Sequence, residues 1–173
     1  GTLALCHPGK PGGTGVSVTT GGTVLFSTAA GAVASVDVNK IFTGDFDNYQ
    51  IIIEADGTST SGVQFALRQG STTAVAAQYD RQQQYGFGAT TAGSQVLAAA
   101  NWSLSGLVAA TNPIVDLKLF RPYLAATTRG ICMSGFAGAP MTATNAANQN
   151  QTVSHRLSVS YDGFNINFGT SAT

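Results

Sequence analysis

Apolar and polar residues alternate at every second position in several short segments of this chain, which limits the folds it can form. In one segment Val115, Leu117 and Leu119 alternate with Asp116 and Lys118. The same spacing occurs in segments 36–38, 63–68 and 157–161. A period of two places one set of side chains on the core face of a strand and the other set in water. We therefore expect antiparallel strands that each have one wet face.

Composition and spacing together predict an all-β fold. Lys and Glu, which usually cover the surfaces of helices, number only four in 173 residues, and no segment has apolar residues at helical spacing backed by charged ones. Strand-like segments recur at intervals of roughly 8–12 residues, which favours a sandwich or a barrel. The stretch 49–55 is more continuously apolar and is expected to be a central strand. We predict an antiparallel β-sandwich or jelly roll of about ten strands.

The first fifteen residues differ from the rest of the chain. Prolines at positions 8 and 11 and glycines at 9, 12, 13 and 15 oppose regular structure. We predict an extended Gly/Pro arm over residues 1–15, followed by one β-sandwich domain over 16–173. Two interpretations of the arm stay open, namely a loose terminus or a segment that packs on a neighbouring subunit.

The chain carries very little charge. Charged residues make up 9% of the sequence, and eight basic residues balance eight acidic ones. An average soluble domain has about 25% charged residues. A neutral, charge-poor surface associates readily, which suits a subunit packed in an assembly. Binding to nucleic acid or to an anionic membrane requires clustered Lys and Arg, so we expect neither nucleic acid nor a membrane as a partner.

Signals for catalysis and metal binding are weak. Most of the seven Asp residues fall in turns or on outward strand positions, and the only Glu is Glu54. Outside the arm His155 is the one candidate general base, and we predict it to be a surface histidine at a strand end. Cys6 and Cys132 are predicted to be two reduced thiols. We expect no enzymatic activity, no cofactor and no metal, with a carboxylate-pair enzyme such as a depolymerase as the third hypothesis.

Carbohydrate binding is an alternative suggested by aromatic residues near polar ones. We predict the polar stretches 70–84 and 138–151 to be long exposed loops, where binding residues are often found. The candidate glycan contacts are Tyr79, Asp80, Arg81, Tyr85 and Trp102. The competing interpretation places Trp102 in the core, because large aromatic side chains dominate core burial.

Three segments share features with a known family. In 35–53 a strand and an Asn-containing turn lead through Phe-Thr and an acidic-aromatic turn into a Tyr and an apolar strand. In 116–129 a strand is followed by an aromatic-x-Pro-aromatic-Leu run that leads into Thr and Arg. The segment 161–164 contains an Asp-Gly-Phe turn. Across most of 33–168 the chain thus resembles the small β-sandwich structural proteins of tailed-phage virions.

The resemblance implies a non-enzymatic virion protein, and we expect a capsid decoration or cement protein that stabilises or coats the head. The arm residues His7, Pro8, Lys10 and Pro11 would then anchor the protein to the capsid. The alternative is a tail or fibre receptor-binding module that contacts host surface glycan. Expected partners are the major capsid protein or tail proteins and further copies of the chain, with a homotrimer as the expected oligomer. The expected location is the virion, assembled in the bacterial host cytoplasm.

Overall fold

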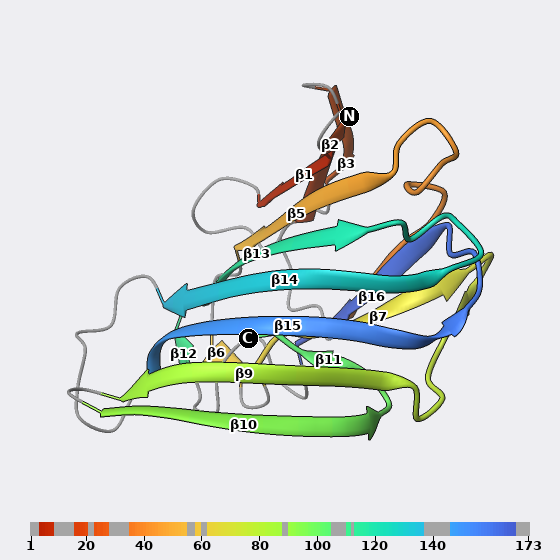
Figure 1. Cartoon of the computed structure of the whole chain (residues 1–173). Helices are drawn as coiled ribbons and strands as arrows, with labels where there is room; N and C mark the ends of the chain where they lie inside the picture. The colour runs from red at the N-terminus through yellow and green to blue at the C-terminus, as the bar shows by residue number, and fades with distance from the viewer. Residues whose placement is uncertain are drawn as a thin grey trace.

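The computed structural model describes residues 4–8, 16–20, 23–27, 35–54, 58–59, 62–87, 90–104, 110–111, 113–136 and 146–168. Every regular element within these residues is a β-strand, and none of them contains a helix long and apolar enough to cross a membrane. Two antiparallel sheets, one of six strands and one of five, enclose a common core (Figure 1). The predicted fold class, an all-β antiparallel sandwich, is confirmed.

The larger sheet has the strand order β10-β9-β15-β14-β13-β5. Its strands are β5 (Asn48–Glu54), β9 (Tyr79–Phe87), β10 (Thr90–Ala99), β13 (Pro113–Phe120), β14 (Thr127–Phe136) and β15 (Ala146–Ser158). All neighbouring pairs run antiparallel. The apolar stretch predicted to be a central strand forms β5, which lies at one edge of this sheet and not in its middle.

The smaller sheet has the order β11-β7-β16-β4, with β8 paired to β7. Its strands are β4 (Ser35–Val38), β7 (Gln64–Gln69), β8 (Thr72–Thr73), β11 (Trp102–Ser103) and β16 (Gly163–Asn167). Two further strands, β6 (Thr58–Ser59) and β12 (Ala110–Thr111), pair with each other. The smaller sheet therefore has short edge strands, whereas the larger sheet ends in longer ones.

A separate three-stranded sheet is formed near the N-terminus by β1 (Ala4–Pro8), β2 (Val16–Thr20) and β3 (Thr23–Ser27). The stretch expected to be an extended arm thus contains a strand, because Ala4–Pro8 pairs with β2. Strand β1 also lies next to β5, at the edge of the six-stranded sheet (Figure 1). Residues 1–3 and 9–15 of the same stretch lie outside the described residues.

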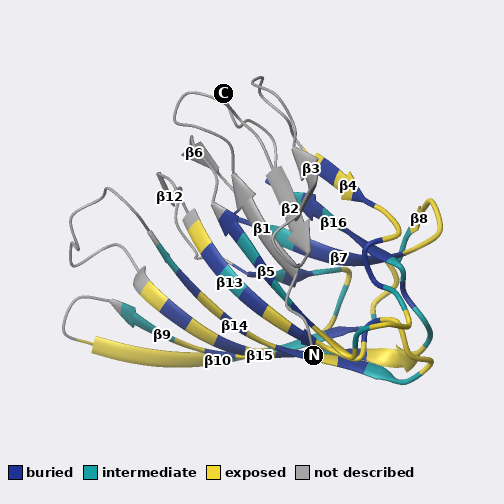
Figure 2. Ribbon diagram, turned by 90° about the horizontal axis from the view of Figure 1, so that it is seen from above, coloured by how far each residue is buried: buried dark blue, intermediate teal, exposed yellow. Residues whose placement is uncertain are grey.

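The core follows the alternation seen in the sequence. In β13 the side chains of Val115, Leu117 and Leu119 are buried and that of Lys118 is exposed, as predicted. The opposing sheet contributes Phe65 and its neighbours from β7. The alternation of buried and exposed positions is visible along β13, β14 and β15 in Figure 2. In β13, β14 and β15 one face therefore forms the core and the other faces solvent, whereas in β7 Ala66 and Arg68 are buried on the second face as well.

Parts of the two segments predicted to be exposed polar loops are instead strands of the larger sheet, and residues 138–145 of the second segment lie outside the described residues. The Gln run at 82–84 lies in β9, and the Asn/Gln run at 148–151 lies in β15. The two runs pair directly, with Gln83 opposite Gln151 and Gln84 opposite Asn150. Within the first segment, the residues before β9 include the short strand β8.

Hydrogen bonds between side chains explain why these polar runs form strands. The side-chain amide of Gln149 donates to the side-chain oxygen of Gln83 at 2.6 Å, and Gln83 donates in turn to the hydroxyl of Ser94 at 2.7 Å. The amide of Gln151 donates to the carbonyl oxygen of Leu104 at 2.9 Å. Buried polar groups are tolerated where they find such partners. Core-facing amide side chains therefore replace apolar ones in this part of the sheet.

The prediction of one strand over 157–161 is wrong. Strand β15 ends at Ser158, and residues 159–162 connect it to β16. Tyr161 is buried although it lies in this connection, and Leu157 is exposed. The apparent period of two thus spans the end of a strand and the start of a packed loop.

Candidate functional site

Three connections meet at one end of the sandwich. They are 39–47 between β4 and β5, 121–126 between β13 and β14, and 159–162 between β15 and β16. The backbone amide of Arg121 donates to the carbonyl oxygen of Asp47 at 2.6 Å. The amide of Tyr161 donates to the carbonyl oxygen of Pro122 at 2.8 Å. The three segments that share the family features are therefore joined at this end by backbone hydrogen bonds.

Asp162 is at the centre of this cluster. Its carbonyl oxygen accepts from the amides of Ile41 and Phe42 at 2.8 and 3.1 Å, and its own amide donates to the carbonyl oxygen of Arg68 at 3.0 Å. Its carboxylate accepts from the amide of Gly70 at 2.9 Å. A carboxylate that accepts from a backbone amide in a turn is a common way to fix loop geometry. The Asp-Gly-Phe turn thus connects three parts of the chain that are distant in sequence.

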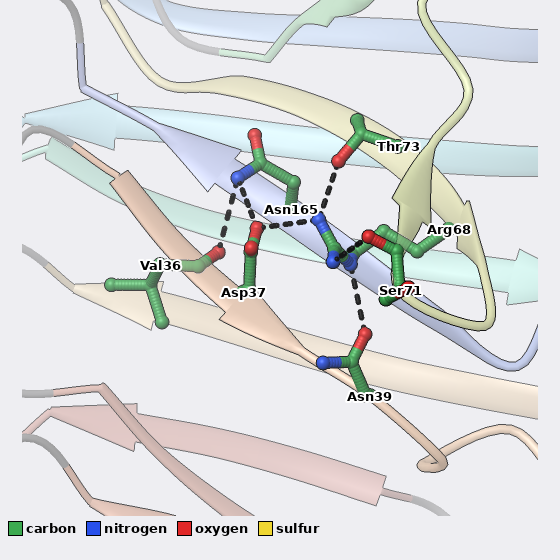
Figure 3. A network of polar contacts seen from close by, with 7 residues as sticks. All are labelled: Val36, Asp37, Asn39, Arg68, Ser71, Thr73 and Asn165. Carbon is green, nitrogen blue, oxygen red and sulfur yellow. Dashed lines mark hydrogen bonds and ion pairs between the residues drawn. The ribbon is translucent and has the colours of Figure 1, made fainter.

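The buried side chain of Arg68 stabilises the neighbouring part of the smaller sheet (Figure 3). Its Nε donates to the side-chain oxygen of Asn39 at 2.8 Å, and its Nη2 donates to the carbonyl oxygen of Ser71 at 2.6 Å. Its Nη1 donates to Thr73 Oγ1 at 2.5 Å and lies 2.8 Å from Asp37 Oδ1. All three guanidinium nitrogens are engaged within the chain, so we assign Arg68 a structural role.

Exposed apolar side chains lie at the end of β13 and on the connection between β13 and β14. Phe120, Tyr123 and Leu124 each expose between 36 and 41% of their surface. Backbone hydrogen bonds hold the connection, including one from the amide of Ala126 to the carbonyl oxygen of Leu124 at 2.7 Å. The hydroxyl of Ser160 also donates to the carbonyl oxygen of Tyr123. A hydrogen-bonded loop therefore presents apolar groups to solvent, as contact surfaces in assemblies often do.

His155 is fully buried, which corrects the prediction of a surface histidine. Its Nδ1 lies 3.0 Å from the hydroxyl of Tyr161, and the amide of Leu157 donates to the same nitrogen at 3.4 Å. The ring of Tyr79 packs edge-on at 4.5 Å between centroids. Burial lowers the pKa of His155 below its ordinary value of 6.5. Because β15 lies within the sheet, its inward positions face the core, and His155 is a neutral core residue.

Two of the predicted glycan contacts are core residues. Trp102 and Tyr79 are both fully buried and pack edge-on at 5.1 Å between ring centroids. Trp102 also stacks on Phe65 at 6.0 Å, and its indole nitrogen donates to the carbonyl oxygen of Ser154 at 3.2 Å. Their assignment as surface glycan contacts is therefore corrected, and the competing interpretation of Trp102 as a core residue is confirmed.

The other three predicted contacts follow Tyr79 along β9. Asp80 forms an ion pair with Arg156 at 2.8 Å, and this hydrogen-bonded partner lowers the pKa of the carboxyl group. Arg81 donates from Nη1 to the carbonyl oxygen of Ser103 at 2.7 Å. Tyr85 is half-buried on the core side of the strand, opposite Gln149. The five residues do not form one exposed aromatic site, because Tyr79 and Trp102 are buried and Tyr85 lies six residues further along β9 than Tyr79.

A shallow groove of about 730 Å³ crosses the outer face of the larger sheet, over β10, β9, β15 and β14. It is lined by the outward-facing residues Gln82, Gln84, Thr91, Gly93, Ile131, Asn150 and Thr152 and by Gln83, Ala92 and Gln151, whose side chains point inward; all ten are uncharged. Ile131 and Met133 expose 50 and 59% of their surface on the same face of β14. Amide and hydroxyl groups beside apolar side chains can make hydrogen bonds and packing contacts. The sequence signal for this surface is the pair of similar polar runs, which form strands and not the predicted loops.

The predicted anchoring residues are only partly described. His7 and Pro8 belong to β1, whereas Lys10 and Pro11 lie outside the described residues. Cys132 is buried and unpaired, and burial raises the pKa of its thiol. Within the described part of the chain, no group of three or more His, Cys, Asp or Glu side chains is arranged to hold a metal ion.

Comparisons of the chain with protein-family models, curated proteins and solved structures find no significant match. The resemblance to virion proteins therefore rests on the three segments described above.

Proposed function

We propose that this protein is a non-enzymatic structural protein of a tailed-phage virion that decorates or cements the head. The observation that supports this proposal is the junction of the three family-like segments. The amides of Arg121 and Tyr161 bond to Asp47 and Pro122, so residues from all three segments form one cluster. Neighbouring antiparallel strands bring these connections to one end of the sandwich, where backbone hydrogen bonds join the three segments. Residues that maintain one loop architecture would meet in this way.

The surface chemistry of the larger sheet supports a role as a subunit of an assembly. The outer face of the larger sheet carries a groove lined only by uncharged residues, beside the exposed side chains of Ile131 and Met133. Core regions of protein interfaces are depleted in charged residues and enriched in apolar ones such as Met. We propose the major capsid protein and further copies of this chain as partners, and the virion, assembled in the bacterial cytoplasm, as the location.

Attachment to the head is proposed to use the N-terminal arm, including His7, Pro8, Lys10 and Pro11. The test mixes the purified 173-residue chain with expanded capsids that lack it and measures co-sedimentation. We expect binding that saturates and that weakens in the variant His7→Ala/Lys10→Ala. The matched control is Lys118→Ala, which removes a single exposed charge from the outer face of the larger sheet. Failure of the wild-type protein to bind capsids would contradict head decoration.

The second candidate is a tail or fibre module that binds host surface glycan, and the uncharged polar groove favours it. Side-chain amides in the groove offer both donors and acceptors to sugar hydroxyls. A glycan array probed with a multivalent form of the protein tests this candidate. Binding that is lost in Gln84→Ala and kept in Lys118→Ala would support it. Absence of binding at high valency would contradict it.

A further inference from the structure

Strand β10 forms one edge of the six-stranded sheet. Among the described residues it pairs only with β9, and none of its ten residues is buried. Thr91 and Gln95 are exposed on the outer face, and Ala92, which points to the inner face, is exposed as well. The strand is mostly yellow in Figure 2. It therefore projects beyond the part of the sheet that the second layer covers.

The other sheet edges of the sandwich are protected. At the opposite edge of the same sheet, β5 lies next to β1 of the N-terminal sheet. The smaller sheet ends in β11 and β4, which have two and four residues. Natural proteins usually blunt long edges with charged residues, proline or a covering segment, because an open edge is a template for strand pairing. The ten residues of β10 include no charged residue and no proline.

A bulge sets the end of the open edge. The pairing of β10 with β9 shifts between Val96 and Ala99, and Ala98 has a φ of 55°. The amide of Ala98 donates to Asp80 Oδ1 at 2.9 Å, so this amide is already satisfied within the chain. A regular partner strand would therefore pair with the stretch from Thr91 to Val96.

We propose that this stretch of β10 pairs antiparallel with the same stretch of a second copy, so that two larger sheets join edge to edge. Identical strands related by a twofold axis place no like charges opposite each other here, because the strand is uncharged. The net charge of the chain is zero, so two copies do not repel at long range. Ala92, Gly93 and Ser94 have small side chains, which allow the two edges to approach closely.

In this contact both copies use the same stretch of β10, so no free β10 edge remains after two copies have paired. The edge thus favours a twofold dimer over the trimer expected from the sequence. A partner strand from another protein could use the same backbone groups, but β10 has no charge with which to select it. The dimer does not depend on the proposed virion role, so the two can fail separately.

Sedimentation equilibrium over a wide range of protein concentration tests the proposal. We expect the mean mass of the wild-type chain to rise from 17.6 kDa toward twice that value. The variant Thr91→Lys/Gln95→Lys puts four positive charges into the joined edge, and its dimer dissociation constant should rise at least tenfold. The control Gln82→Lys/Gln84→Lys adds the same charge to exposed positions one strand further in, on β9. It should dimerise like the wild type.

Hydrogen exchange provides the second measurement. It first checks the fold of both lysine variants, whose amides outside the substituted strands should exchange as in the wild type. Amides within 91–96 should become more protected as the wild-type concentration rises. A wild-type chain that stays monomeric at every concentration would overturn the proposal. A dimer weakened equally by both lysine pairs would also overturn it, since that result would place the contact on the outer face of the sheet.

Discussion

The guanidinium of Arg68 and the carboxylate of Asp37 are joined across the smaller sheet, with Nη1 2.8 Å from Oδ1. The Arg68 side chain exposes 6% of its surface and the Asp37 side chain 48%. The amide of Asn165, on the strand between them, donates to the same Asp37 oxygen at 2.6 Å (Figure 3). The ion pair therefore links the buried and exposed ends of one polar network.

Replacing Arg68 tests how much this network contributes to the free energy of unfolding. We expect Arg68→Ala to lower the free energy of unfolding by about 2–3 kcal/mol, as measured by urea denaturation. Breaking a buried pair usually costs about 3–5 kcal/mol, and the partial exposure of Asp37 reduces that loss. The control is Arg156→Ala, whose pair with Asp80 is solvent-accessible and should leave stability close to that of the wild type. Equal losses in the two variants would show that burial of Arg68 adds nothing.

Gly163 has no room for a side chain. A Cβ atom built on Gly163 would overlap the carbonyl oxygen of Val38 and come within 2.9 Å of the Cα of Asn39. We expect Gly163→Ala to lower the free energy of unfolding by about 3 kcal/mol, because forced overpacking moves the backbone of β4 away from β16. Gly93→Ala is the control, since the atom nearest to a Cβ built there, the carbonyl oxygen of Gln83, is 3.4 Å away. A Gly163→Ala protein as stable as the Gly93→Ala protein would refute this close approach.

Burial of His155 makes stability depend on pH. Its folded pKa lies below the unfolded value of about 6.5, so below that pH the unfolded chain binds more protons than the folded one. The free energy of unfolding should therefore be highest above pH 6.5 and fall as the pH drops toward 5. Urea denaturation at several pH values measures the slope. The slope should be reduced in His155→Gln and retained in His7→Gln, and an unchanged slope in His155→Gln would contradict the assignment.

The single tryptophan reports directly on the core. Trp102 is fully buried between Phe65 and Tyr79, so its emission should be blue-shifted in the native state and only weakly quenched by acrylamide. Its spectrum should not change when glycans are added, even if the outer groove binds them. Emission typical of a solvent-exposed indole would contradict the packing described above.

The sequence predicts the core correctly where apolar and polar residues alternate strictly and only one face of the strand is buried. Val115, Leu117 and Leu119 were assigned to the core because Asp116 and Lys118 separate them, and the structure agrees. The fold class followed from several such segments. The position of β5 in its sheet did not, since a continuously apolar strand can lie in the middle of a sheet or at an edge that a further segment covers.

The candidate surface was harder to predict because polarity alone does not separate a loop from a strand. The Gln runs of β9 and β15 form hydrogen bonds with each other, as Gln149 does with Gln83, and this depends on a partner 66 residues away. His155 looked like a surface residue for the same reason. Its partners are Tyr79, which lies opposite it on the neighbouring strand β9, and Tyr161, which lies in the connection that follows β15.

Cryo-electron microscopy of intact particles from the source that produces this chain tests the central proposal most directly. Head decoration predicts density for the six- and five-stranded sandwich at regular lattice positions on the capsid shell. Density confined to the tail would contradict head decoration and favour the receptor-binding alternative. Absence of the chain from purified particles would contradict the virion assignment altogether.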